Sequence, residues 1–150
     1  MNADVFMMGE FEAVIPSDRL YAKNHMWAQQ TDKGFRFGFS AYAVRLLQDV
    51  YFLDWEIDAP CEISPKQEMG SIESKKAESV IYSPCQGHLE QFNPSLLNDP
   101  SAINVDKYGE GWLFELVISN PDFLDAAQYI EHLGNVWQDA QRTIKGQMNQ

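Results

Sequence analysis

Two adjacent lysines, Lys75 and Lys76, stand where the chain can expose a reactive amine. A run with strand character, residues 69–74, precedes them, and a second, residues 77–82, follows and ends before Ser83-Pro84. Two short strands around a polar segment predict a hairpin with the lysines at its tip. An amine in that position is open to an enzyme that forms an amide with it. Most exposed lysines in turns are only solvated charges, so the residues alone leave both interpretations open.

The sequence around Lys76 resembles the lipoylation hairpin of the glycine cleavage system H proteins, which reads roughly Gly-x-Val/Ile-Glu-Ser-Val-Lys-Ala-x-Ser. The matching positions are Gly70, Ile72, Glu73, Ser74, Lys76, Ala77 and Ser79. The resemblance implies that Lys76 carries lipoate, with Glu73, Ser74, Ala77 and Glu78 around the attachment point. Glu73 and Glu78 either help a lipoyl-attaching enzyme to recognise the tip or only solvate the hairpin.

Further motifs follow in the order of the family, over about residues 17 to 118. Those that resemble family motifs most clearly are His25-Met26-Trp27, Gly38-Phe39-Ser40, Leu47-Gln48-Asp49-Val50, Tyr82-Ser83-Pro84 and Tyr108-Gly109-Glu110-Gly111-Trp112. The resemblance places His25 near the region where the lipoyl arm docks. A structural histidine beside Trp27 is the alternative.

Four positions depart from the family pattern. Lys75 stands where the family usually has Val, Met26 replaces a Glu, Gln48 a Gly and Lys107 a Pro. None of these changes removes the lysine to be modified. They indicate a divergent member and bear on its partners rather than on its fold.

The resemblance implies a carrier rather than an enzyme. A lipoyl arm on Lys76, attached by a lipoate-protein ligase or lipoyl transferase, would shuttle an aminomethyl group between glycine decarboxylase, aminomethyltransferase and dihydrolipoyl dehydrogenase. A second hypothesis is a lipoate-binding carrier for a heterodisulfide-reductase-like sulfur-oxidation complex, which the altered tip favours. A third is an interaction module that has lost its cofactor. The sequence has no nucleophile elbow, P-loop or Gly-x-Gly-x-x-Gly motif, so no catalytic residue is predicted.

Composition excludes some partners. The chain has 150 residues and is 45% hydrophobic, enough to bury one compact core. A net charge of −11, from 22 acidic and 11 basic residues, disfavours nucleic acid and anionic membrane as partners. No apolar run reaches the length of a membrane helix, and the first ten residues lack the basic residues of a targeting signal. We therefore expect a cytoplasmic protein.

Neither a metal site nor a disulfide is predicted. Cys61 and Cys85 form no Cys-x-x-Cys pair and are interpreted as two semi-buried thiols in a reducing compartment. A bridge between them, or a thiol partner for the lipoyl arm, is the alternative. His25, His88 and His132 lack ligand spacing such as His-Glu-x-x-His.

Short strands between proline and glycine signals predict a mainly β fold. We expect a lipoyl-domain-like sandwich or flattened barrel of two antiparallel sheets, with short helices and a C-terminal helix. Aromatic residues alternate with others in residues 35–39, as in a strand with one buried face, and Ser40 is a fair N-cap for the helix that follows.

Three segments are expected: a loose N-terminal segment (1–13), a lipoyl-carrier domain (14–119) and a C-terminal helical extension (120–150). Asn120-Pro121 predicts the N-cap and first position of the last helix. A stripe of side chains at helical spacing predicts the face that packs on the domain, with Gly134 as a candidate break: Phe123, Ala127, Ile130, Gly134 and Trp137.

Overall fold

The computed structural model describes the backbone of residues 3–148 and the side chains of residues 3–139. The strands are β1 (Ala3–Met8), β2 (Phe11–Pro16), β3 (Leu20–Tyr21), β4 (Met26–Gln30), β5 (Phe35–Phe39), β6 (Val50–Trp55), β7 (Cys61–Ile63), β8 (Glu68–Ser74), β9 (Glu78–Tyr82), β10 (Gly87–Phe92) and β11 (Phe114–Val117). The helices are α1 (Ala41–Leu47), α2 (Ser95–Asn98), α3 (Ala102–Val105) and α4 (Ala126–Met148).

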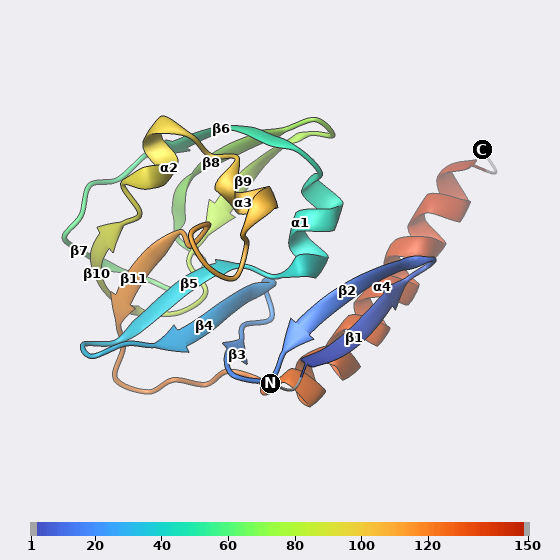
Figure 1. The fold of residues 1–150 in the computed structure, drawn as a ribbon, viewed down its shortest axis with the longest axis horizontal. Coiled ribbons are helices and arrows are strands. Elements are labelled where there is room, and N and C mark those ends of the chain that lie inside the picture. Colours follow the sequence, from blue (N-terminus) through green and yellow to red (C-terminus); the bar gives the residue numbers. More distant parts are fainter. Residues whose placement is uncertain (1–2, 149–150) are drawn as a thin grey trace.

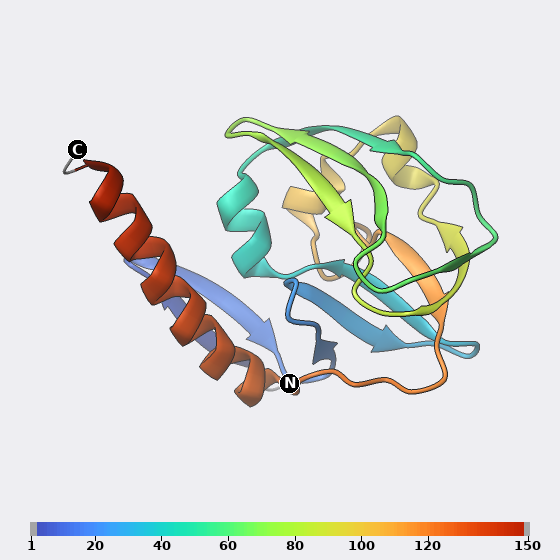
Figure 2. The same ribbon diagram turned by 180° about the vertical axis from the view of Figure 1, so that it is seen from behind.

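Two antiparallel sheets form the body of the protein, as predicted. One has six strands in the order β3-β4-β5-β11-β10-β7, and the other has three in the order β6-β8-β9. They face each other across one core, and Figures 1 and 2 show the two sheets from opposite sides. Phe37 and Leu89 come to this core from the larger sheet, and Ile72 and Ile81 come from the smaller one. The mainly β fold with short helices and a C-terminal helix is thereby confirmed.

Strand β5 sets the position of helix α1. Phe37 is fully buried, and Gly38 lies so close to the Trp27 ring that a Cβ at this position would approach ring atom Cζ2 to 2.5 Å. Only glycine fits under that ring. Ser40 then caps α1 as predicted, because its Oγ accepts a hydrogen bond from the Ala43 amide at 3.3 Å. Packing of β5 thus fixes the first turn of α1.

The N-terminal segment 1–13 was predicted to be loose, and that prediction is wrong for the residues that the structure describes. Strands β1 and β2 pair over their full length as a hairpin, with Gly9 at a φ of +66° in the turn. Ala13 and Ile15 of β2 are fully buried in a cluster with Tyr129 and Leu133 of α4. The hairpin is ordered because α4 covers one of its faces, as Figure 1 shows. The expected boundary at residue 14 falls inside β2.

The last helix begins later than Asn120-Pro121 predicted. Leu124 and Tyr21 exchange two backbone hydrogen bonds of 2.8 Å, which hold the chain extended up to that point. Asp125 then caps α4: its carboxylate accepts from the Gln128 amide at 2.8 Å, and the Gln128 side chain accepts from the Asp125 amide at 2.9 Å. The helix therefore begins at Ala126 and continues through Gly134 without a break.

This later start changes the buried stripe of α4. Phe123 precedes the helix and packs on Phe35 and Phe37, and Ala127 is exposed. Among the α4 side chains that the structure describes, the fully buried ones are Tyr129 and Leu133, and both belong to the cluster with β1 and β2. The buried face of α4 therefore packs within the chain, as predicted, but it packs on the N-terminal hairpin that was expected to be loose.

We predict that Leu133→Ala lowers the free energy of unfolding by about 2–5 kcal/mol, because it leaves a cavity between α4 and the hairpin. The matched control is Leu97→Ala on α2, where the side chain is 62% exposed and the loss should stay within about 0.5 kcal/mol. Urea unfolding followed by tryptophan fluorescence measures both. Equal losses in the two variants would contradict the docking of α4.

Candidate functional site

The β8–β9 hairpin presents Lys75 and Lys76 at its tip, as the sequence predicted. Glu73 and Glu78 are the last paired residues, and the Ser74 amide donates to the Ala77 carbonyl at 3.0 Å. Ser74 is buried, and its Oγ accepts from the Ala77 amide at 3.3 Å. These bonds close a short loop in which both lysines are exposed. The role of Ser74 in the structure is to lock the turn.

A backbone contact anchors the tip to the rest of the protein. The Lys75 amide donates to the Asp49 carbonyl at 2.8 Å, just after the end of α1. The hairpin and α1 are therefore held together, and Figures 1 and 2 show the tip beyond the C-terminal end of this helix. The two lysines line different hollows. Lys76 lines a cleft toward β4 and β5, and Lys75 lines a separate groove between α1 and α3.

The cleft beside Lys76 is mainly apolar and has a volume of about 410 Å³. Its walls come from α1 and from β8 and β9, and the apolar side chains that line it include Phe39, Leu46, Leu47, Ile72 and Val80. Asn24 and His25 supply polar groups at one end. A hydrophobic chain attached to Lys76 could leave water by lying in this cleft.

His25 reaches the cleft through long-range contacts. It adopts a left-handed backbone conformation with a φ of +73°, and its carbonyl accepts from the Ser40 amide at 2.9 Å. Its ring Nδ1 lies 2.9 Å from the Tyr129 hydroxyl, which lies 2.8 Å from Ser40 Oγ. The resemblance placed His25 near the docked arm, and the structure brings it and Lys76 to the same cleft.

The histidine ring is neutral at pH 7. Burial and, to a smaller extent, the neighbouring His132 ring lower the pKa of His25 to about 4. Burial also raises the pKa of Tyr129, so its hydroxyl keeps its proton. One arrangement of donors then satisfies every group in this chain of hydrogen bonds. The Ala43 amide donates to Ser40 Oγ, the Ser40 hydroxyl donates to the Tyr129 hydroxyl, and the Tyr129 hydroxyl donates to Nδ1 of His25. The polar end of the cleft is thus uncharged.

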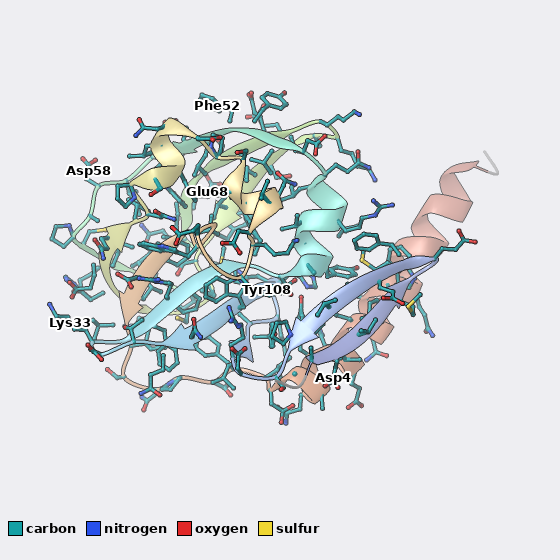
Figure 3. The ribbon with its side chains drawn as sticks, viewed as in Figure 1. Asp4, Lys33, Phe52, Asp58, Glu68 and Tyr108 are labelled. Atoms are coloured by element: carbon teal, nitrogen blue, oxygen red, sulfur yellow. The ribbon has the colours of Figure 1, made fainter. Side chains whose placement is uncertain are left out.

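The two acidic residues expected at the tip lie directly opposite each other on β8 and β9. Glu73 is half-buried and also pairs with Phe52 of β6, whereas Glu78 is exposed. Phe52, labelled in Figure 3, extends from the outer face of this sheet and is 48% exposed. An acidic and aromatic surface therefore adjoins the tip.

Sequence reasoning missed several of the residues around the tip. Asn24 and Leu46 line the cleft but belong to none of the sequence motifs. Tyr129 was not predicted as a site residue, although its hydroxyl bonds to Ser40, 89 positions earlier in the chain. Ala43 and Leu47, which are apolar residues of α1 spaced four positions apart, also line the cleft. Only the spacing of apolar residues in α1 could have indicated part of this surface.

The cysteines are free thiols and lie away from the tip. Cys85 follows the end of β9 that is farther from Lys76, and burial raises its pKa to about 11. A thiol with so high a pKa is a poor nucleophile at neutral pH. Within the described side chains, no group of three or more His, Cys, Asp or Glu residues is placed to hold a metal ion.

Comparison with known proteins identifies the family. The family model of the glycine cleavage H-protein matches residues 19–138. The chain belongs to this family. It is 36% identical to the glycine cleavage system H protein of Methylacidiphilum infernorum, over 83% of this chain and 97% of that protein. It is 35% identical to that of Rubrobacter xylanophilus, over 81% and 96%.

A solved structure supports the same assignment. The crystal structure of a glycine cleavage system H protein from Mycobacterium marinum superposes with a TM-score of 0.68 at 30% identity, covering 81% of this chain and 98% of that one. H proteins are lipoate-carrying shuttle proteins, so the family implies a lipoate cofactor and an association with the glycine cleavage enzymes. The sulfur-oxidation and cofactor-free alternatives are not favoured. None of the described helices is long and apolar enough to span a membrane.

We predict that the neutral state of His25 makes stability depend on pH. The pKa is about 4 in the folded chain and near 6.5 when unfolded, so the unfolded state binds the proton more tightly. The stabilisation that depends on the neutral His25 ring is therefore complete above about pH 6.5 and is lost as the pH falls toward 4. His25→Asn, which tolerates the left-handed backbone, should lose less stability than the wild type between pH 7.5 and pH 5 in urea unfolding.

The control for this experiment is His88→Asn, at a partly exposed histidine on β10 that pairs with Glu62 at 2.6 Å. Because His25 is retained in this variant, its free energy of unfolding should fall more between pH 7.5 and pH 5 than that of His25→Asn. Direct NMR titration of the His25 ring offers a second measurement. A midpoint near pH 6.5 in the folded protein would contradict the burial argument.

Proposed function

We propose that this chain carries lipoate in amide linkage on Lys76 and moves a bound group between the enzymes of glycine cleavage. The observation that carries the proposal is the position of Lys76, exposed at a locked hairpin tip and next to an apolar cleft, in a chain of the H-protein family. A tip held by Ser74, Ala77 and Asp49 presents one amine in a defined place. Defined presentation is what an attaching enzyme needs.

Attachment changes the charge of the tip. An amide on Lys76 removes one positive charge and leaves Lys75 as the remaining cation. Glu73 and Glu78, opposite each other just below the tip, are the proposed recognition groups for a lipoate-protein ligase or lipoyl transferase. Ser74 and Ala77 keep the turn in shape while the amine enters a second active site.

The cleft gives the carrier a protective function. A lipoyl group supplies, when bound, a dithiolane that takes up and releases a substrate fragment. Leu46, Leu47 and Ile72 would exclude water from a chain lying in the cleft, and the neutral His25 would add no charge at its polar end. Tethering to Lys76 keeps the local concentration of the arm high at each partner's active site.

The proposed partners are glycine decarboxylase, aminomethyltransferase and dihydrolipoyl dehydrogenase, all of them in the cytoplasm. The chain itself would contribute no catalytic residue, because its part is to position and shield the arm. The side chains that surround Lys76 are an amide, a histidine, serines and apolar groups. They fit a docking surface for a hydrophobic arm.

The first test is modification. Incubation of the purified chain with a lipoyl-attaching enzyme and lipoate should add one lipoyl mass by intact-protein mass spectrometry. Lys76→Arg should abolish the addition, since arginine keeps the charge but cannot form the amide. Lys75→Arg is the matched control and should still be modified. Modification that persists in Lys76→Arg and disappears in Lys75→Arg would show that the neighbouring lysine is the attachment point.

The second test is activity in the pathway. The lipoylated chain, mixed with the glycine cleavage enzymes of its own source, should support glycine decarboxylation, and the Lys76→Arg variant should not. Loss of its gene should leave growth on reduced sulfur compounds unchanged. An inert lipoylated chain together with impaired growth on sulfur compounds would refute the glycine cleavage assignment.

A further inference from the structure

A second groove lies on the other side of the tip from the cleft. It has a volume of about 380 Å³ and runs between α1, the hairpin tip, the residues around α3 and the start of β2. The charged and polar side chains that line it include Arg45, Gln48, Asp49, Lys75, Asn104 and Lys107. We call it the basic groove, because three cations face one carboxylate there.

The charge of the basic groove is opposite to that of the whole chain, which carries a net charge of −11. Within residues 3–139, neither Arg45, Lys75 nor Lys107 forms an ion pair, whereas Arg19 and Arg36 pair with Asp18 and Glu115. Arg45 instead lies over the Phe11 ring, 4.3 Å from its centroid. Its charge is held in place but not neutralised.

The scaffold under these cations is tightly bonded. Asn104 donates to the Gln48 carbonyl at 2.6 Å and accepts from the Val50 amide at 2.8 Å, which ties α3 to the end of α1. The Lys107 carbonyl accepts from the Trp27 ring nitrogen at 2.9 Å. The cations thus project from fixed backbone on three separate elements, so their convergence is a property of the fold.

The departures from the family pattern gather at this groove. Gln48, Lys75 and Lys107 are three of the four positions at which the sequence differs from the H-protein motifs quoted above, and all three line it. The fourth, Met26, is buried in the core. Two of the three groove departures add a positive charge. A surface that has gained cations beside the attachment point indicates a partner with carboxylates.

We propose that the basic groove binds an acidic segment of the enzyme that receives the lipoyl arm. This rests on the proposed function, because the arm on Lys76 brings that enzyme within reach of Lys75. The tip then has an acidic side, with Glu73 and Glu78, and a basic side. Opposite charges on the two sides admit one orientation of the partner and repel the reverse one.

The groove suits a flexible acidic segment better than a small anion. Three of its backbone donors are already used: the Ala41 amide bonds to the Tyr108 hydroxyl at 2.8 Å, and the Gln48 and Lys75 amides bond to carbonyls. A bound anion would meet only long side chains spread over about 380 Å³. Several carboxylates on one segment can reach such dispersed cations, whereas a single phosphate cannot.

The experiment compares charge reversals in the lipoylated chain. Lys107→Glu lies outside the tip, and Lys33→Glu makes the same change of charge at the β4–β5 turn, which Figure 3 shows on the opposite side of the molecule. Intact mass first confirms that each variant carries lipoate. In glycine decarboxylation, Lys107→Glu should raise the KM for the carrier about tenfold and leave kcat unchanged. Lys33→Glu should change neither, and Lys107→Arg should keep the wild-type KM.

A second variant guards against misfolding. Lys75→Glu alters an exposed side chain and should raise the KM for the carrier as Lys107→Glu does. The KM of the wild type should also rise with salt concentration more than the KM of either variant does. A KM for Lys107→Glu and Lys75→Glu equal to that of Lys33→Glu would overturn the proposal.

A third measurement does not depend on the pathway. The unmodified chain is titrated at low salt with hexaglutamate peptide or with inorganic phosphate, and NMR signals are followed. Hexaglutamate should shift the signals of Arg45, Lys75 and Lys107, and phosphate should shift them much less. Equal saturation by phosphate would identify a small-anion site and overturn the proposal. If the wild type is inactive in glycine decarboxylation, the proposed function fails while this titration still decides the groove.

Discussion

The hydrogen-bond chain from Ala43 through Ser40 and Tyr129 to His25 holds together parts of the protein that are about a hundred residues apart. It fixes helix α1, which forms a wall of both the apolar cleft and the basic groove. Tyr129 also stacks flat on Tyr21, with ring centroids 4.7 Å apart. The C-terminal helix therefore supports the site from behind, although none of its side chains up to residue 139 lines the cleft or the groove.

The tip separates two surfaces over one residue. Lys76 lies on the cleft and Lys75 on the basic groove, because a tight turn directs neighbouring side chains to different sides. The proposed modification of Lys76 would leave Lys75 free to meet a partner. A hydrophobic arm and a charged contact can thus act side by side without sharing a surface.

The β1–β2 hairpin and α4 pack against each other beside this body. The match to the family model begins at residue 19, so the hairpin lies outside it, whereas Tyr129 and Leu133 lie inside. The hairpin covers the apolar side of α4 with Met8, Ala13 and Ile15. Phe11, at the start of β2, reaches the basic groove beneath Arg45. The added strands therefore extend the family fold toward the surface where its sequence is unusual.

The sequence by itself determined the local elements. Lys76 at a hairpin tip, the cap at Ser40 and the strand at residues 35–39 all follow from turn residues and alternation over a few positions. Tertiary structure decided the rest. The N-terminal hairpin needed α4 to cover it, and α4 began at Ala126 because Tyr21 holds Leu124 extended. The cleft, the His25 contacts and the basic groove depend on residues that meet only after folding, and no local pattern records such distant contacts.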